Sequence, residues 1–140
     1  MSQEILDFVG AVIDAVARQD AAGLMELTDP EVEWHPFAAQ LAEGGVYRGH
    51  EGIKRYVSDL GDAWEFLRGE ADDALVVGNV VVLVGHLRFR GKGSGVETEV
   101  ATGWVLKLRN RRVAYMRSFR DPEQALLTLG VSEQDAHADS

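Results

Sequence analysis

The order of two hydrophobic periodicities constrains the fold of this chain more than any other feature. Up to about residue 64, apolar residues recur at intervals of three and four, which is typical of amphipathic helices. From Phe66 onward the pattern changes to Val- and Leu-rich stretches separated by turns, which is typical of β-strands. Helices followed by a meander of long strands predict an α+β fold, in which N-terminal helices pack on the concave face of a cone-shaped, mostly antiparallel sheet.

The same patterns predict the individual elements. The first predicted helix runs from Gln3 to about Gln19 with Ser2 as N-cap, and Asp20 caps a short second helix through Leu27. The third runs from about His50 to Trp64, and the last, capped by Asp121-Pro122, continues through Leu129 and is ended by Gly130. The predicted strands span Glu31 to His35, Ala74 to Arg90, Glu97 to Leu108 and Val113 to Arg120. The stretch from Pro36 to Gly49 has little periodicity and is predicted to be a loop.

Length and composition set limits on the organisation and the chemistry. A chain of 140 residues suits one domain, predicted here to span 1–130, and the polar, acidic residues 131–140 are typical of a disordered tail. There is no cysteine, and the four histidines lack the spacing of metal ligands, so we expect no metal and no cofactor. No stretch approaches the roughly 20 apolar residues of a membrane helix, and the N-terminus lacks the basic region of a signal peptide. We therefore expect a cytoplasmic protein without a membrane partner.

Charge argues against a nucleic-acid partner. The net charge is -9, whereas nucleic-acid binding depends on Lys and Arg side chains that neutralise phosphates. Basic residues do gather between Arg88 and Arg120, but the segment lacks the interleaved exposed aromatics that stack on bases. We interpret them as solvated cations that protect a sheet face and its edges.

Two local motifs resemble a known family. The segment from Tyr47 to Ile53 reads Tyr-Arg-Gly-His-Glu-Gly-Ile, and the last strand and helix contain Arg-Ser-Phe-Arg-Asp from Arg117 to Asp121, with Ala-Leu following. With the order of elements, these motifs resemble the SnoaL-like branch of the nuclear transport factor 2-like superfamily from Ile5 to Gly130. The resemblance implies the cone fold, a small-molecule pocket, and a homodimer formed through the outer sheet face.

The catalytic positions of that superfamily are only partly kept here. In its ketosteroid isomerase-like members a carboxylate base precedes a proline, and the resemblance places His35 there, before Pro36. The two oxyanion donors of those members correspond to Val12 and Trp104, so the stabilisation of an enolate is lost. The charged residues of its limonene-epoxide-hydrolase-like members correspond to Gly85, Leu87 and Ser118. Ser118 also replaces the base of the SnoaL-like cyclases.

Candidate site residues follow from the resemblance and from strand alternation. His35 is the candidate general acid/base, because its ordinary pKa near ~6.5 suits proton transfer, and Ser118 is the candidate hydrogen-bond donor. The candidate ligand-binding residues are Trp34, Tyr56, Trp104, Met116 and Arg120. The alternatives are a core role for the tryptophans, a packing role for Tyr56 and a solvated charge for Arg120. On the predicted strand from Ala74 to Arg90, His86 lies on the face opposite to Leu83 and Leu87. We assign it to the surface or the dimer interface.

Two functions remain open from the sequence. The first is a SnoaL-like protein that binds a hydrophobic cyclic compound, as an isomerase-, cyclase- or hydrolase-like enzyme. The second is a non-catalytic dimeric module that carries a ligand or serves as a scaffold, which the loss of the family's charged groups favours. The residues alone do not decide whether the protein is an enzyme.

Overall fold

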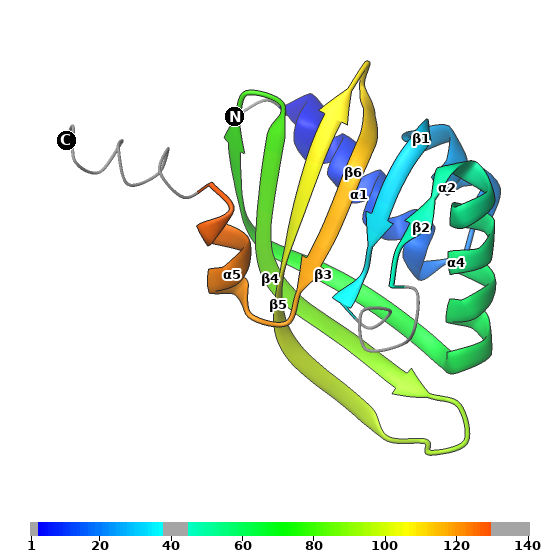
Figure 1. Cartoon of the computed structure of the whole chain (residues 1–140). Coiled ribbons are helices and arrows are strands. Elements are labelled where there is room, and N and C mark those ends of the chain that lie inside the picture. Colours follow the sequence, from blue (N-terminus) through cyan, green and yellow to red (C-terminus); the bar gives the residue numbers. More distant parts are fainter. Residues whose placement is uncertain (1–2, 38–44, 130–140) are drawn as a thin grey trace.

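A strongly curved, six-stranded sheet is the centre of the computed structural model, which describes residues 3–37 and 45–129 (Figure 1). The helices are α1 (Gln3–Ala17), α2 (Ala21–Leu27), α4 (Gly49–Ala63) and α5 (Pro122–Leu127). The strands are β1 (Thr28–His35), β2 (Tyr47–Arg48), β3 (Trp64–Val77), β4 (Val80–Gly91), β5 (Glu97–Arg109) and β6 (Arg112–Phe119). The predicted α+β fold with helices on a curved sheet is confirmed.

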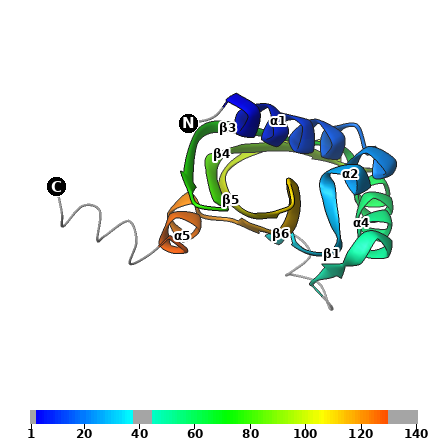
Figure 2. The same cartoon turned by 90° about the horizontal axis from the view of Figure 1, so that it is seen from above.

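The sheet wraps around the N-terminal helices. Its strand order is β2-β1-β6-β5-β4-β3, and every neighbouring pair is antiparallel except β1 and β6, which run parallel. Figure 2 shows the strands curving into an arc, with α1 across its open side and α2 and α4 beside β1. The concave face is therefore enclosed by helices, while the short α5 packs on the outer face of β5 and β4.

Strand register brings residues of four strands into line on the concave face. One row across the sheet joins Val81, Leu106, Met116 and Trp34, which are successive Cα partners. The next row joins Leu83, Trp104 and Ser118. Because side chains alternate between the two faces of a strand, both rows face the helices.

The helices contribute apolar side chains at helical spacing to the same core. Val9 and Val12 of α1 are buried, in agreement with the helical spacing of apolar residues in this segment, and Ala15 is buried as well. The Asp20 side chain caps α2 by accepting a hydrogen bond from the Gly23 N–H at 2.9 Å, which confirms its predicted role. Asp121 caps α5 in the same way, through the Glu123 N–H.

Some predicted boundaries were wrong. The apolar stretch from Ala74 to Arg90 is not one strand, because Gly78 adopts a left-handed φ of 61° and turns the chain between β3 and β4. Strand β1 begins at Thr28, since Thr28 pairs with Val113 of β6 despite the proline at position 30. Helix α5 ends at Leu127, two residues earlier than predicted.

Some predictions lie outside the described residues. These are the N-cap at Ser2, the central part of the loop between Pro36 and Gly49, the helix stop at Gly130 and the tail 131–140.

A bulge in β3 sharpens the curvature of the sheet. Cα partners shift by one between Ala71 and Asp73, opposite Gly85 of β4. At Gly85 the backbones are so close that a Cβ atom would lie 1.9 Å from the carbonyl oxygen of Glu70. Glycine is therefore required at this position, where β3 and β4 approach most closely.

Candidate functional site

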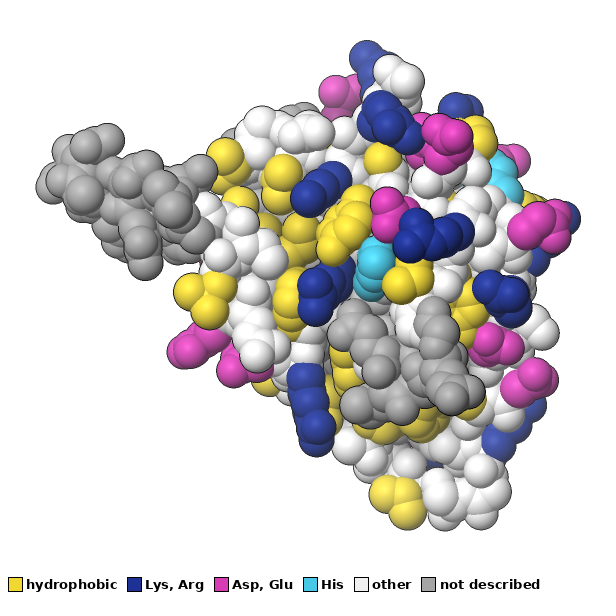
Figure 3. Space-filling model, viewed as in Figure 1, with side chains coloured by type: hydrophobic (Ala, Val, Ile, Leu, Met, Phe, Trp, Pro, Cys, Tyr) yellow, Lys and Arg dark blue, Asp and Glu magenta, His cyan; other side chains and the backbone are white. Residues whose placement is uncertain are grey.

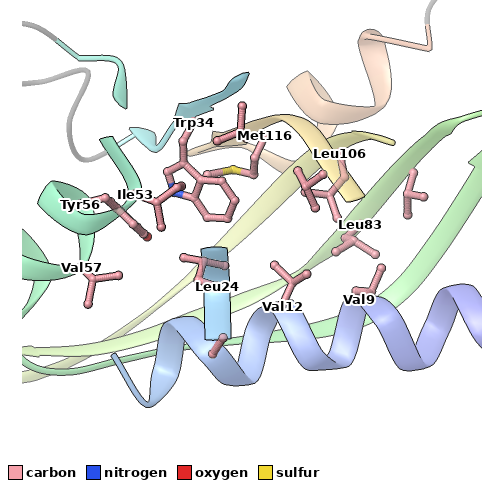
Figure 4. Close-up of a cluster of buried hydrophobic side chains, with 14 of the residues drawn as sticks. Val9, Val12, Leu24, Trp34, Ile53, Tyr56, Val57, Leu83, Leu106 and Met116 are labelled. Carbon is pink, nitrogen blue, oxygen red and sulfur yellow. The ribbon is translucent and has the colours of Figure 1, made fainter. Parts of the chain in front are cut away.

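A cavity of about 350 Å³ lies between the concave face of the sheet and helices α1 and α4. Its wall is mostly apolar and includes residues of every strand and of both helices. Figure 4 shows Val12 of α1 facing Leu83 and Leu106 of the sheet, with Trp34 near Tyr56 of α4. A cavity of this size, with a few polar groups in an apolar wall, is typical of small-molecule sites.

All three tryptophans of the chain line this cavity. Trp34 comes from β1, Trp64 from the start of β3 and Trp104 from the middle of β5. Gly69 of β3 leaves room for the Trp104 indole, because a Cβ atom at Gly69 would lie 3.1 Å from that ring. The three indoles give the cavity broad, flat apolar surfaces, which suit a ligand with rings.

Trp34 and Tyr56 bring polar groups into the deep part of the wall. Their ring centroids are 5.5 Å apart, and both side chains are buried. Burial raises the pKa of Tyr56 to about 12 and outweighs the lowering effect of a hydrogen bond with the Trp34 side chain. The Tyr56 phenol thus keeps its proton at neutral pH, with the Trp34 indole beside it.

Tyr47 and Asp59 form a second polar pair on the wall. The Tyr47 hydroxyl donates a hydrogen bond to a carboxylate oxygen of Asp59 at 2.5 Å. Burial, followed by this hydrogen bond and the charge of Asp59, raises the pKa of Tyr47 to about 12. Asp59 is the one charged residue on the cavity wall within the described part of the chain.

Ser118 occupies the opposite side of the cavity, on β6. Its hydroxyl oxygen accepts a hydrogen bond from the Phe37 N–H at 2.7 Å. A hydroxyl that accepts one hydrogen bond can still donate its own proton, so Ser118 remains able to donate to a ligand. The same contact fixes the chain after β1 against β6.

The structure brings five of the seven predicted site residues together. They are Trp34, Tyr56, Trp104, Met116 and Ser118, which all line the cavity. Val12 and Leu87, at positions that carry catalytic groups in the resembling enzymes, line it as well. Four of the positions transferred by resemblance, Val12, Leu87, Trp104 and Ser118, therefore face a common space, while the roles of these residues stay predictions.

The expected placement of His35 in the pocket was wrong. His35 pairs with Arg117 across the sheet, so it shares the outer face with Arg117, while Trp34 takes the inward place. The His35 ring packs against Tyr115 with centroids 5.0 Å apart, and Nε2 lies 3.4 Å from a carboxylate oxygen of Glu33. His35 is not among the cavity residues, so this geometry gives it no access to a ligand there.

Arg120 was also misplaced by the sequence. Strand β6 ends at Phe119, so the inward and outward alternation does not extend to Arg120. Its side chain is exposed and does not line the cavity. The alternative interpretation as a solvated charge fits this position.

Sequence reasoning missed Tyr47 and Asp59. Asp59 lies three residues after Tyr56, and Ala63 lies seven after it, so all three share one face of α4. That spacing was a usable signal for Asp59. The partnership of Asp59 with Tyr47 joins two elements and leaves no local pattern.

No helix in the described part of the chain has the length and apolar character needed to cross a membrane. No cluster of three or more potential metal ligands occurs within residues 3–37 and 45–129.

The raised pKa of Tyr56 predicts a loss of stability at alkaline pH. A group with a higher pKa in the folded state stabilises that state below its unfolded pKa of about 10.0, and this contribution is lost as the pH rises towards about 12. Over that range the unfolding free energy of the wild type should fall by roughly 2 kcal/mol more than that of Tyr56→Phe. Urea unfolding of both proteins across this range measures the difference. Parallel pH profiles would contradict the burial of the phenol.

Comparisons with known proteins agree with the fold. The chain matches a solved protein of nuclear transport factor 2-like fold and unknown function from Burkholderia pseudomallei, with a TM-score of 0.75, 20% identity, and coverage of 94% of this chain and 99% of that one. It matches TerC, co-crystallised with polyporic acid, with a TM-score of 0.73, 18% identity, and coverage of 87% and 95%. These identities support a common fold.

A putative SnoaL-like polyketide cyclase from Shewanella denitrificans matches with a TM-score of 0.72, 15% identity, and coverage of 91% and 96%. Comparison with curated protein sequences gave no match. The sequence model of the SnoaL-like domain, in contrast, matches residues 9–116, which is most of the chain and includes nearly every element that builds the cavity. The chain therefore belongs to the SnoaL-like domain family.

Proposed function

We propose that this protein binds a hydrophobic, ring-containing small molecule in the cavity between the sheet and helices α1 and α4. The observation that carries the proposal is the wall itself, which combines three indoles with aliphatic side chains around about 350 Å³. Apolar area removed from water on binding contributes about 25 cal/mol per Å², so such a wall favours an apolar ligand. The co-crystallisation of TerC with polyporic acid and the name of the Shewanella protein support a small-molecule role for this fold.

The charged side chains on the cavity wall limit the class of ligand that we expect to bind. No Lys, Arg or His lines the cavity within the described part of the chain, and Asp59 adds a negative charge to its wall. An anionic ligand would lose its hydration without gaining a cationic partner. We therefore expect neutral ring compounds to bind more tightly than their carboxylated analogues.

The tryptophans provide the readout for a direct test. N-phenyl-1-naphthylamine is a neutral ring compound whose fluorescence increases in apolar surroundings. We expect its emission to rise and saturate as it is titrated, with tryptophan emission falling at the same midpoint, near micromolar concentration to order of magnitude. A rise that never saturates, or one that persists in protein unfolded by urea, would contradict a specific cavity site.

Catalysis is the second candidate function, and the Tyr47–Asp59 pair favours it. A carboxylate on an apolar wall can act as a general base, with the neighbouring phenol orienting it. Ser118 on the opposite side can donate a hydrogen bond to the reacting oxygen. Under this proposal Asp59→Asn retains binding of the neutral probe but abolishes turnover of any substrate found. A substrate turned over equally by the variant would contradict it.

A homodimer through the outer sheet face is the arrangement we propose for the assembly. A second hollow of about 280 Å³ lies on that face between β5, β6 and the end of α5, and nearby Val77 and Leu127 are 48% and 67% exposed. Figure 3 shows Lys and Arg side chains standing among hydrophobic ones on the face seen in Figure 1. The Lys107 ammonium lies 4.7 Å from the centre of the Tyr115 ring, so cationic and aromatic groups lie together on the outer sheet face. A sedimentation mass that stays at 15.4 kDa at high concentration would contradict the dimer.

A further inference from the structure

The second hollow, on the outer face of the sheet, has the positive charge that the cavity lacks. This outer hollow has a volume of about 280 Å³ and lies between β5, β6 and the end of α5. Its wall is apolar at Val77, Val80 and Val105, and it also contains Lys107 and Arg117. No carboxylate lines it within the described part of the chain. The outer hollow is therefore opposite in charge to the cavity, whose one charged wall residue among those described is an aspartate.

Strand register brings the two cations of the outer hollow together. Lys107 of β5 is the Cα partner of Tyr115 on β6, and Arg117 follows Tyr115 by two positions on the same strand face. Diagonal neighbours of this kind on one face of a sheet lie roughly 7–8 Å apart, which is within the reach of long side chains. Both cations can therefore contact one bound anionic group.

Neither cation has an ion-pair partner among the described residues. Elsewhere on the sheet, in contrast, Arg88 and Arg90 both pair with Glu97. Acidic residues outnumber basic ones in this chain by 23 to 14, so a shortage of carboxylates does not explain why Lys107 and Arg117 lack one. The positive charge of the outer hollow is therefore free to attract an anionic ligand.

Aromatic rings hold the two cations in place instead. The Lys107 ammonium lies 4.7 Å from the centre of the Tyr115 ring, and the Arg117 guanidinium carbon lies 4.8 Å from the centre of the Phe119 ring. A cation over a ring keeps N–H donors that point away from it, so both groups can still donate hydrogen bonds to a carboxylate. Both rings line the outer hollow too. Apolar side chains, flat rings and two positive charges thus meet in one place.

We propose that the outer hollow is a second ligand site, which binds small aromatic carboxylates. The ring of such a ligand lies against the valines, and its carboxylate accepts hydrogen bonds from Lys107 and Arg117. The net charge of -9 disfavours anions in general, so binding of an anion depends on this local pair of cations. The cavity and the outer hollow then select ligands by charge, and the second site does not depend on binding in the first.

2-Naphthoate and 2-naphthamide provide a matched pair of probes. They share the naphthalene ring and differ in having a carboxylate or a neutral amide of similar shape. In a methyl NMR titration we expect 2-naphthoate to shift Val77, Val80 and Val105 saturably, with a midpoint near millimolar concentration to order of magnitude. The cavity residues Leu83 and Leu106 should not respond to it. 2-Naphthamide should bind to the outer hollow about fivefold more weakly, because exposed ion pairs contribute a modest free energy.

Three variants that each remove one positive charge assign the binding to residues. Lys107→Gln and Arg117→Gln should each weaken 2-naphthoate by about threefold or more and leave 2-naphthamide unchanged. Arg120→Gln is the matched control, because Arg120 is exposed and lines neither the cavity nor the outer hollow. It makes the same change in net charge and should leave the affinity for 2-naphthoate unchanged.

The outer hollow lies on the sheet face that we propose for the homodimer, so a ligand and a second copy compete for it. A ligand that binds only the uncovered face favours the monomer by mass action. In a dimeric sample, saturating 2-naphthoate should therefore lower the sedimentation mass towards 15.4 kDa. Valine shifts with an unchanged dimer mass would support the site and contradict the placement of the dimer over it.

Three results would overturn the site. Equal affinities for 2-naphthoate and 2-naphthamide at the three valines would show that charge has no part in binding. An equal loss of affinity in Arg120→Gln and in the two hollow variants would show that only net charge matters. Absence of any saturable shift of the three valines would show that the outer hollow binds no aromatic carboxylate, while binding of neutral ring compounds in the cavity would still be decided by its own titration.

Discussion

Val12→Trp is expected to abolish the binding of ring compounds while the protein stays folded. Val12 lies in the middle of α1 and faces the cavity from the side opposite the sheet. An indole at this position fills space that a ligand would occupy. We expect the affinity for N-phenyl-1-naphthylamine to fall by about 100-fold or more, which corresponds to a loss of roughly 3 kcal/mol of binding free energy.

The same substitution at an exposed position is the control. Val96 lies beyond β4 in the turn before β5, 62% exposed and outside the cavity, so Val96→Trp adds an indole without filling it. It should leave probe affinity unchanged. The free energy of unfolding of Val12→Trp should change by less than about 2 kcal/mol, because the added ring enters a cavity rather than close-packed core. Unchanged probe affinity in Val12→Trp would show that the probe binds elsewhere.

Gly85→Ala is expected to have the largest effect on stability. The new Cβ atom would lie 1.9 Å from the carbonyl oxygen of Glu70 and 3.0 Å from the Cα of Ala71, both of which are backbone atoms of β3. Since backbone atoms cannot swing aside as a side chain does, β3 and β4 must separate at the bulge. We expect a loss of about 3 kcal/mol or more in the free energy of unfolding, measured by urea denaturation.

Gly10→Ala is the matched control, and it should change the free energy of unfolding in the opposite direction. Gly10 is an exposed residue within α1, and no atom lies within 4 Å of the Cβ that alanine would add. Gly10→Ala should therefore raise the free energy of unfolding by about 0.5–1 kcal/mol, through helix propensity alone. If Gly85→Ala were as stable as the wild type, the close approach of β3 and β4 would be wrong.

The fold was predictable because its elements are encoded locally. The apolar spacing of α1 and the cap at Asp20 need only their own neighbourhood to be recognised. The turn at Gly78 was missed although Gly78-Asn79 between Val77 and Val80 is a two-residue hairpin signal, because the Val-rich sequence on both sides was taken as one strand. The early start of β1 depends on pairing with β6, about 85 residues further on. Such long-range pairing overrides the local effect of Pro30.

Site residues were predicted correctly only on strands where the face that points into the cavity was identified correctly. On β6 the inward residues Met116 and Ser118 were identified from alternation and from the resemblance. On β1 the resemblance favoured His35, although the alternation of Val32 and Trp34 with Glu31, Glu33 and His35 already indicated which face is apolar. On β1, the alternation of apolar and polar residues predicted the inward face better than the resemblance did. The inward residue on this strand is therefore Trp34, and the expected base, His35, lies on the outer face.

A methyl NMR titration of the protein with fluorenone, a neutral planar ring compound, would locate the ligand site within the fold. Methyl groups report on both hollows, because Leu83, Leu106 and Met116 line the cavity while Val77, Val80 and Val105 line the hollow on the outer face. We expect saturable chemical-shift changes of Leu83, Leu106 and Met116, with the outer-face valines unaffected. Shifts confined to the outer-face valines, or no saturable shifts at all, would contradict a ligand site beneath the helices.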